Sequence, residues 1–232
     1  MKKIALFLLV IIGSISVMGQ NCDYYMPFQL NKGMQYQSFS AKDKLTGSNE
    51  TIVKKIDNVD GFVVATMMSR AMDQKGKLVN ESEYSIKCNG TTIMIDMKSM
   101  INPQSMAGFE GMDVVIEGSD MELPNALVVG STLPDARMKM TVMNNGIGFM
   151  DMIIEITSRK VESKETINVP AGTYECYKIT YDTYVETKTM GIPIRVKGKS
   201  VEYFSKGIGS VKTETFDEKG RSQGYTVLSK IL

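Results

Sequence analysis

The chain has 232 residues, enough for one β domain with a substantial core, and its 27 basic and 26 acidic residues almost cancel. This balance argues against nucleic acid or an anionic membrane surface as a main partner. The sequence contains no histidine, so Ser-His-Asp catalysis, Cys-His catalysis and common zinc sites are excluded.

The N-terminus has the pattern of a secretory signal peptide. Lys2 and Lys3 supply a basic start, and the apolar run from Ile4 to Ile12 follows them. A cleavage position after Gly19 fits the small or tolerated residues found there. The alternative is a membrane anchor, but the apolar run is short for a span, which needs ~20 residues.

The leader predicts the compartment and the domain organisation. Removal of residues 1–19 leaves residues 20–232, which we interpret as a single antiparallel β domain in the periplasm or outside the cell. Cys22 raises the further alternative of a lipidated mature N-terminus. Asn21 argues against it, because a lipobox needs a small residue at that position.

Three cysteines remain after the leader: Cys22, Cys88 and Cys176. In an oxidising compartment one pair can close and leave one free thiol. We favour Cys22 with Cys88, because this bridge would fix the N-terminal arm. The alternative, in which all three stay reduced, is left open by the sequence.

Turn signals at regular spacing divide the chain into short alternating segments. Asn89-Gly90 is the strongest of them, since this dipeptide is typical of a two-residue hairpin. Such spacing favours a meandering antiparallel sheet over βαβ units. The expected strands are 34–39, 51–57, 62–72, 78–87, 91–97, 113–121, 137–142, 150–161, 173–183, 194–204, 211–216 and 225–232.

The clearest strand follows the turn at Gly172. Tyr177, Ile179 and Tyr181 fall on one face of it, and Lys178 falls on the other. Alternation of aromatic and β-branched residues with charged ones indicates a half-buried strand. No acid, base or nucleophile in this stretch has an evident partner.

Two segments interrupt the rhythm of strands. Residues 97–111 contain spaced apolar side chains around Asn102-Pro103, which predicts one or two short helical turns covering the concave side of the sheet. Residues 124–134 are expected to form a connecting loop. The predicted fold is therefore mostly β: a single curved antiparallel sheet forming an unclosed barrel.

Three phrases carry a resemblance to a known family. They are GSTLPD at 130–135, VPAGTYECYK at 169–178 and EYFSKGIGSVK at 202–212. In this order they resemble the TapB-like family of exported bacterial proteins of unknown function. That family is similar to the periplasmic lipoprotein-carrier (LolA/LolB-like) fold. The resemblance implies a fold and a compartment and transfers no catalytic residue.

Methionine is unusually frequent, with 19 residues. In 137–142, Met138, Met140 and Val142 are expected to point inward. Because methionine is flexible and polarisable, a methionine-lined concave face could accept a lipid or acyl chain. The proposed groove consists of Met97, Met100, Met106, Phe109, Met138, Met140, Met150 and Met152.

Two other interpretations of the methionines stay open. The plainer one is ordinary core filling, since methionine is a common core residue. The sharper one is Cu(I) binding by thioethers, because Met138-Lys139-Met140 and Met150-Asp151-Met152 place both sulfurs of each motif on one strand face. No histidine supports such a site.

The sequence therefore predicts an exported, non-enzymatic protein that binds or carries a hydrophobic molecule. The alternative is a structural or protein-interaction module of the cell envelope with no small-molecule ligand. We expect no catalytic residue, metal or cofactor, no nucleic-acid partner and no transmembrane span. An envelope protein partner fits either interpretation.

Overall fold

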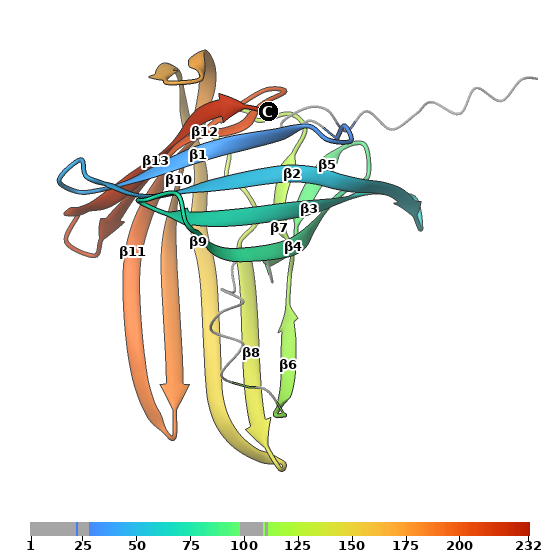
Figure 1. The fold of residues 1–232 in the computed structure, drawn as a ribbon, viewed down its shortest axis with the longest axis vertical. Coiled ribbons are helices and arrows are strands. Elements are labelled where there is room, and N and C mark those ends of the chain that lie inside the picture. Colours follow the sequence, from blue (N-terminus) through green and yellow to red (C-terminus); the bar gives the residue numbers. More distant parts are fainter. Residues whose placement is uncertain (1–21, 23–27, 98–108, 110) are drawn as a thin grey trace, which may run out of the picture.

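The computed structural model describes residues 22, 28–97, 109 and 111–232; the predicted leader, 1–19, lies outside this range (Figure 1). The described residues form one antiparallel sheet of 13 strands in the order β6-β8-β9-β10-β11-β12-β13-β1-β2-β3-β4-β5-β7. Its strands are β1 (Gly33–Ser40), β2 (Leu45–Val59), β3 (Phe62–Asp73), β4 (Leu78–Cys88), β5 (Thr92–Ile95), β6 (Asp113–Gly118), β7 (Met121–Pro124), β8 (Ala136–Asn144), β9 (Ile147–Val169), β10 (Gly172–Thr189), β11 (Ile192–Ser205), β12 (Gly209–Asp217) and β13 (Ser222–Ile231).

The predicted fold class is confirmed in its main part: the protein is mostly β, with a single antiparallel sheet that does not close. The helical part of the prediction is not confirmed, because no α-helix occurs among the described residues. Most of the segment expected to be helical, 98–108 and 110, lies outside them. Within the same described ranges, no helix is long and apolar enough to cross a bilayer.

Tight turns explain why the chain forms a meander. Asn145 and Gly146 both have positive φ, 50° and 77°, as a two-residue hairpin turn between twisted strands requires. At the predicted Asn89-Gly90 turn, the Asn89 side chain accepts hydrogen bonds from the backbone N–H groups of Thr91 and Thr92, at 3.0 and 2.9 Å. Each turn fixes the register of the strands that it joins.

The longest strand, β9, was predicted too short. It runs unbroken for 23 residues and carries a bulge at Ser158, whose φ is 55°. The register of the partner strand β10 shifts opposite it, between Thr180 and Asp182. Because a bulge adds bend and twist, the long strands leave the rest of the sheet at this level.

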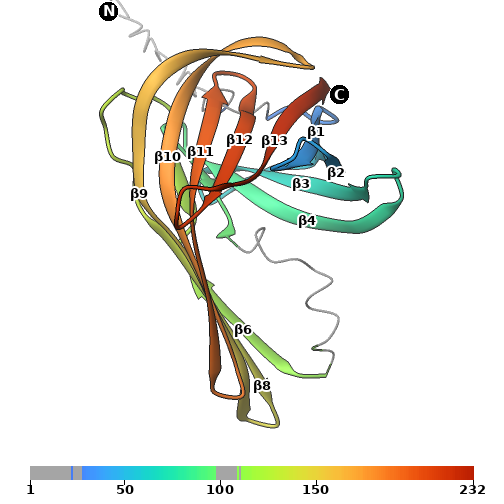
Figure 2. The same ribbon diagram turned by 90° about the vertical axis from the view of Figure 1, so that its left-hand side faces the viewer.

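Two parts of the sheet result, and Figures 1 and 2 show them from two sides. The extension, as we call it, is the five-stranded lower part formed by β6, β8 and residues 147–156, 182–189 and 192–198 of the three long strands. The body is the remainder of the sheet. Strand β12 pairs with β11 only from Gly198 upward, so residues 192–197 of β11 form an edge of the extension.

The two edge strands of the whole sheet are consecutive in the chain. Residues 113–121 were predicted as one strand, but β6 pairs with β8 in the extension and β7 pairs with β5 in the body. Only Ser119 and Asp120 separate them. A Cβ on Gly118 would collide with the carbonyl of Arg137, so this glycine permits the close approach at the switch. The sheet therefore curls until its two ends meet here without closing.

The main core lies inside the curl of the body. Strands β2 to β5 face β9 to β11 across it, and Val53, Ile86, Ile93 and Val161 are at most 1% exposed. The faces predicted for the strand after Gly172 are correct, since Ile179 is buried in this core with Tyr177 and Tyr181 packed beside it. A second cluster, around Met138 and Ile156, continues the inner side into the extension.

A disulfide joins Cys22 to Cys88, the pair favoured by the sequence analysis, with Cα atoms 5.9 Å apart. Both residues are buried in the main core, at 5% and 0% exposure. The bridge therefore attaches the start of the domain to the last residue of β4. Since its sulfur is bonded to Cys88, Cys22 has no free thiol to carry a lipid.

The third cysteine, Cys176, is free and 1% exposed, and it belongs to a small outer cluster with Tyr203 and Val211. Burial raises the pKa of the Cys176 thiol to about 11. We expect the folded protein to resist Ellman's reagent at pH 8, because both access and thiolate are lacking. One thiol should react once urea unfolds the oxidised chain; rapid labelling of the folded protein would contradict this placement.

Candidate functional site

The inner side of the extension is built from three cross-strand rows. Adjacent residues in an antiparallel register share a face, so the pairing itself assigns the rows. The members of the rows define the inner apolar face, and Thr187 and Thr189 are its only polar side chains. In order from β6 to β11 the rows are Gly118, Met138, Ile154, Val185, Val196; then Ile116, Met140, Met152, Thr187, Ile194; then Val114, Val142, Met150, Thr189, Ile192.

Exposure changes steeply across this face. On β8, Met140 is 1% exposed and Val142 is 0% exposed. On β11, Val196, Ile194 and Ile192 are 60%, 67% and 71% exposed. Apolar side chains that continue a core face yet remain open to solvent mark an interaction site more often than chance placement does.

The opposite face of the same strands is polar. Arg137 pairs with Glu155 at 2.9 Å, and the Thr141 hydroxyl donates to Asp151 at 2.9 Å. Near the free edge, Arg195 on β11 pairs with Glu186 on β10. The extension is therefore an amphipathic sheet, with apolar side chains on its inner face and polar side chains on its outer face.

Polar groups stand at the upper end of the inner apolar face. The Arg159 guanidinium, 4% exposed, donates from Nη1 to the carbonyls of Glu122 and Pro134 at 2.8 and 2.7 Å. These bonds hold β7, through Glu122, and the loop that follows it, through Pro134, against β9.

A shallow cavity of about 190 Å³ lies lower on the same side, and Val185, Val196 and Ser200 are among its lining residues.

Glu202 lies farther up β11 than Ser200, on the same face. Burial raises its pKa from 4.5 to about 6, while the hydrogen bond with Ser210 and the charge of Arg159 act in the opposite direction. Burial also raises the pKa of Tyr84 on β4 to about 12. The inner side of the body thus holds one carboxyl that is difficult to ionise.

This raised pKa predicts that stability falls as pH rises from about 4.5 to about 6. In that window the unfolded chain releases the Glu202 proton while the folded chain retains it, which favours unfolding by roughly 2 kcal/mol. Glu202→Gln should abolish this part of the pH dependence. Urea unfolding of both proteins from pH 4 to 7.5 measures the difference, and parallel profiles would show that Glu202 is not the group responsible.

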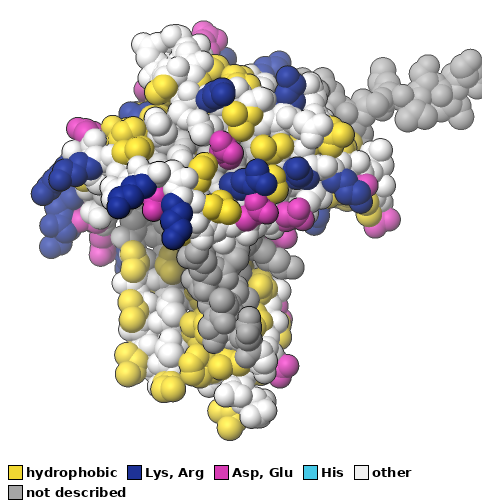
Figure 3. Space-filling model, viewed as in Figure 1, with side chains coloured by type: hydrophobic (Ala, Val, Ile, Leu, Met, Phe, Trp, Pro, Cys, Tyr) yellow, Lys and Arg dark blue, Asp and Glu magenta, His cyan; other side chains and the backbone are white. Residues whose placement is uncertain are grey.

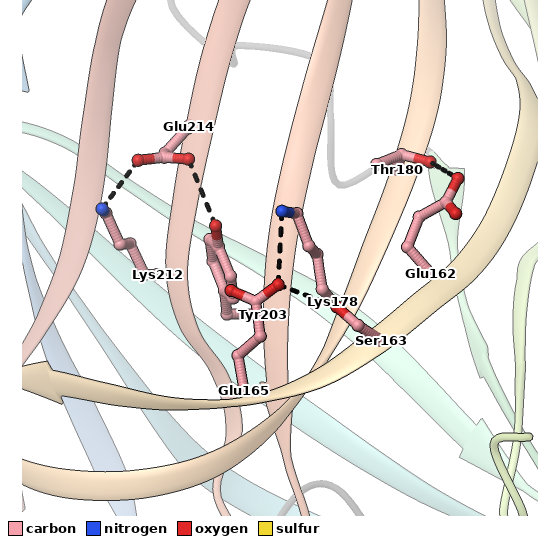
Figure 4. Close-up of polar contacts among 8 residues, drawn as sticks. All are labelled: Glu162, Ser163, Glu165, Lys178, Thr180, Tyr203, Lys212 and Glu214. Carbon is pink, nitrogen blue, oxygen red and sulfur yellow. Dashed lines mark hydrogen bonds and ion pairs between the residues drawn. The ribbon is translucent and has the colours of Figure 1, made fainter. Parts of the chain in front are cut away.

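A second polar group, on the outer face of the body, is shown in Figure 4. Lys178 pairs with Glu165 at 3.3 Å, Lys212 pairs with Glu214 at 2.7 Å, and the Tyr203 hydroxyl donates to Glu214 at 3.5 Å. Each basic group has an acidic partner, and the pairs lie at the surface. We interpret them as a solvated ladder above the Cys176 cluster, where such pairs contribute little each.

The predicted groove residues are only partly brought together. Met97 and Met138 are buried in the core of the extension, and Met140 is buried as well. Met150 and Met152 lie half-buried in the middle of the inner apolar face, and Phe109 packs edge-on against Phe149 at 6.2 Å. Met100 and Met106 lie outside the described residues.

Core filling is therefore the structural role of Met138 and Met140. Copper binding gains no support from them, since an ion would have to reach almost completely buried sulfurs. The exposed part of the face was missed by the sequence analysis: Ile192, Ile194 and Val196 on β11. Their alternation with Arg195 and Lys197 was visible, but their exposure depends on where β12 ends.

Comparison with known proteins places the chain in a family. The sequence profile described as DUF3108-like matches residues 31–228, which is most of the sheet. The chain belongs to the DUF3108-like family. The TapB-like family and the lipoprotein-carrier fold, expected from sequence phrases, are not confirmed. No curated protein matches this DUF3108-like chain.

Two solved structures share the fold. One is a protein assigned as exported, with a YmcC-like fold, from Bacteroides fragilis; it is 22% identical, with a TM-score of 0.70, over 91% of this chain and 100% of that one. The other is a protein assigned as a lipoprotein from Parabacteroides distasonis; it is 21% identical, with a TM-score of 0.72, over 92% of this chain and 100% of that one. At this identity the likeness establishes the architecture and no activity.

Proposed function

We propose that this DUF3108-like protein is an exported, non-enzymatic protein that binds a hydrophobic molecule, a lipid or an acyl chain, on the inner apolar face. One observation carries the proposal: the three rows continue from buried Met140 to Ile194, which is 67% exposed, without a charged side chain. Exposure of this apolar surface to water is unfavourable, and an acyl chain lying across β10 and β11 would cover it.

The compartment proposed is outside the cytoplasm. The two solved structures that share the fold are assigned as an exported protein and a lipoprotein. A buried disulfide between Cys22 and Cys88 also suits an oxidising compartment. A non-enzymatic role is part of the proposal, and the composition of the inner apolar face supports it: the face carries no general base that could activate its two threonine hydroxyls.

Binding of cis-parinaric acid, a fluorescent acyl chain, tests the proposal. Ile194→Glu places a charge in the middle row and should weaken binding at least tenfold, because an acyl chain that covers this position would have to desolvate the carboxylate. Lys197→Glu, on the polar side of the same strand, is the matched control and should bind as the parent does. Both positions are exposed, so both variants should fold.

Two results would contradict the proposal. The parent could fail to bind the probe saturably, or Ile194→Glu could bind it as tightly as the parent. In either case the acyl chain would not lie on the inner apolar face.

One feature favours the second candidate, an envelope interaction module without a ligand. In the extension, β11 has a free edge from Ile192 to Lys197, and such an edge can pair with a strand of another protein. Arg195 and Lys197 on this strand disfavour non-specific pairing with the edge strands of other proteins. A partner captured through this edge, together with no binding of cis-parinaric acid, would favour this candidate.

A further inference from the structure

Two hairpin turns form the far end of the extension, and both expose large apolar side chains (Figure 1). The turn between β8 and β9 carries Ile147, which is 74% exposed. The turn between β10 and β11 carries Met190 and Ile192, which are 76% and 71% exposed. The backbone N–H of Met190 donates to the carbonyl of Phe149 at 3.2 Å, so the two turns lie side by side. We call Ile147, Met190 and Ile192 the tip.

The tip is free of charge. Residues 143–150 and 189–194 include no acidic or basic side chain, and the charge nearest to them on β6 is Asp113, opposite Met143. On β11 the first charge is Arg195, three residues behind Ile192 and so roughly 10 Å away at the rise of a β-strand. On the view in Figure 3, the Lys and Arg side chains gather over the body, while hydrophobic side chains continue down to the lower end.

We propose that the tip inserts into the interface of a phospholipid bilayer. A projecting wedge of uncharged apolar side chains fits a fluid lipid surface, whereas a rigid protein partner would need a matching socket. The depth of the uncharged zone agrees with the 5–10 Å typical of interfacial insertion. Lys188 and Arg195 stand just behind it, where their long side chains can reach the headgroups.

The charge distribution identifies the kind of surface. Arg195 is paired with Glu186, and Lys188 lies opposite Asp151 in the register of β9 and β10. Asp113 on β6, opposite Met143, adds one more acidic group near this end. Because these groups carry no excess of positive charge and the whole chain is near neutrality, attraction comes from apolar burial and not from anionic headgroups. Binding to neutral phosphatidylcholine vesicles should therefore be almost insensitive to salt. The proposal does not depend on a ligand occupying the inner apolar face.

A single tryptophan provides the test, because the chain contains none. Ile147→Trp should show a blue-shifted emission when phosphatidylcholine vesicles are added, and brominated phosphatidylcholine should quench it. Val128→Trp, in the loop between β7 and β8 at a position that is 62% exposed, is the control and should show neither change. The protein should also float with the vesicles, which separates insertion from extraction of a lipid molecule.

Paired triple variants measure the contribution of the tip. Ile147→Ser, Met190→Ser and Ile192→Ser together should lower vesicle partitioning at least tenfold. Serine at Leu78 on β4 and at Val128 and Val129 in the loop between β7 and β8, which are 52%, 62% and 50% exposed, should leave it unchanged.

Four results would overturn the proposal: no blue shift with vesicles, lipid extraction without flotation, equal loss in both triple variants, or a blue shift that needs protein concentration and no vesicles. The last would mean that a second copy of the chain covers the tip.

Discussion

Met140→Asp is expected to destabilise the protein by about 4 kcal/mol or more, or to prevent folding. Met140 lies in the middle row of the inner apolar face, is 1% exposed, and faces Ile116 and Met152 on the neighbouring strands. Neither side chain can donate a hydrogen bond to a carboxylate or supply a positive charge, so the charge would be buried without a partner. Urea unfolding followed by circular dichroism measures the loss.

The matched control is Val115→Asp. Val115 is 43% exposed on β6 and lies opposite Thr141, on the polar face of the extension. The same carboxylate stays hydrated there, and we expect a cost of about 1 kcal/mol or less. If Met140→Asp unfolded at the parent's urea concentration, the assignment of the two faces of β8 would be wrong.

Loss of the Cys22–Cys88 disulfide is expected to have an effect of similar size. The bridge spans a sequence separation of 66 residues, for which the loss of chain entropy in the unfolded state corresponds to roughly 4 kcal/mol. Replacing both cysteines by alanine also removes side chains from the main core. The double variant should therefore unfold at a much lower urea concentration than the oxidised parent.

Two controls separate loss of the bridge from loss of the buried side chains: chemical reduction of the parent, and the variant Cys176→Ala. Reduction by a phosphine should shift the parent toward the double variant, because it breaks the bridge and keeps both side chains. Cys176→Ala retains the bridge and should lose only about 1 kcal/mol, from the small cavity that it leaves. Identical unfolding of the oxidised and reduced parent would show that the bridge does not hold the domain.

Local patterns explain most of the architecture. The alternation in 137–142 and 173–183 assigned the faces correctly. Successive side chains of a strand point to opposite faces, so a sheet buried on one face requires an apolar residue at every second position. Asn89-Gly90 located a hairpin, since glycine tolerates the positive φ of 89° that Gly90 adopts there. The bulge at Ser158 has no such signature, so the length of β9 and the bend of the sheet were not foreseen.

The candidate site was less predictable for a physical reason. Methionine content indicated an apolar surface, but whether a methionine is core or surface depends on what the sheet brings against it. Met138 and Met140 became core, while Ile194 and Val196 stayed exposed because β12 stops pairing at Gly198. Strand ends far apart in the sequence decide this outcome, and no local window contains both.

Native mass spectrometry of the protein, isolated from its own cell envelope without unfolding, tests the central claim most directly. That claim is that the inner apolar face is a binding surface for a hydrophobic molecule. We expect the parent to carry a lipid-sized additional mass that is lost on activation, and Ile194→Glu to carry much less of it than Lys197→Glu. A bare mass for the parent, or equal loading of the two variants, would contradict the account.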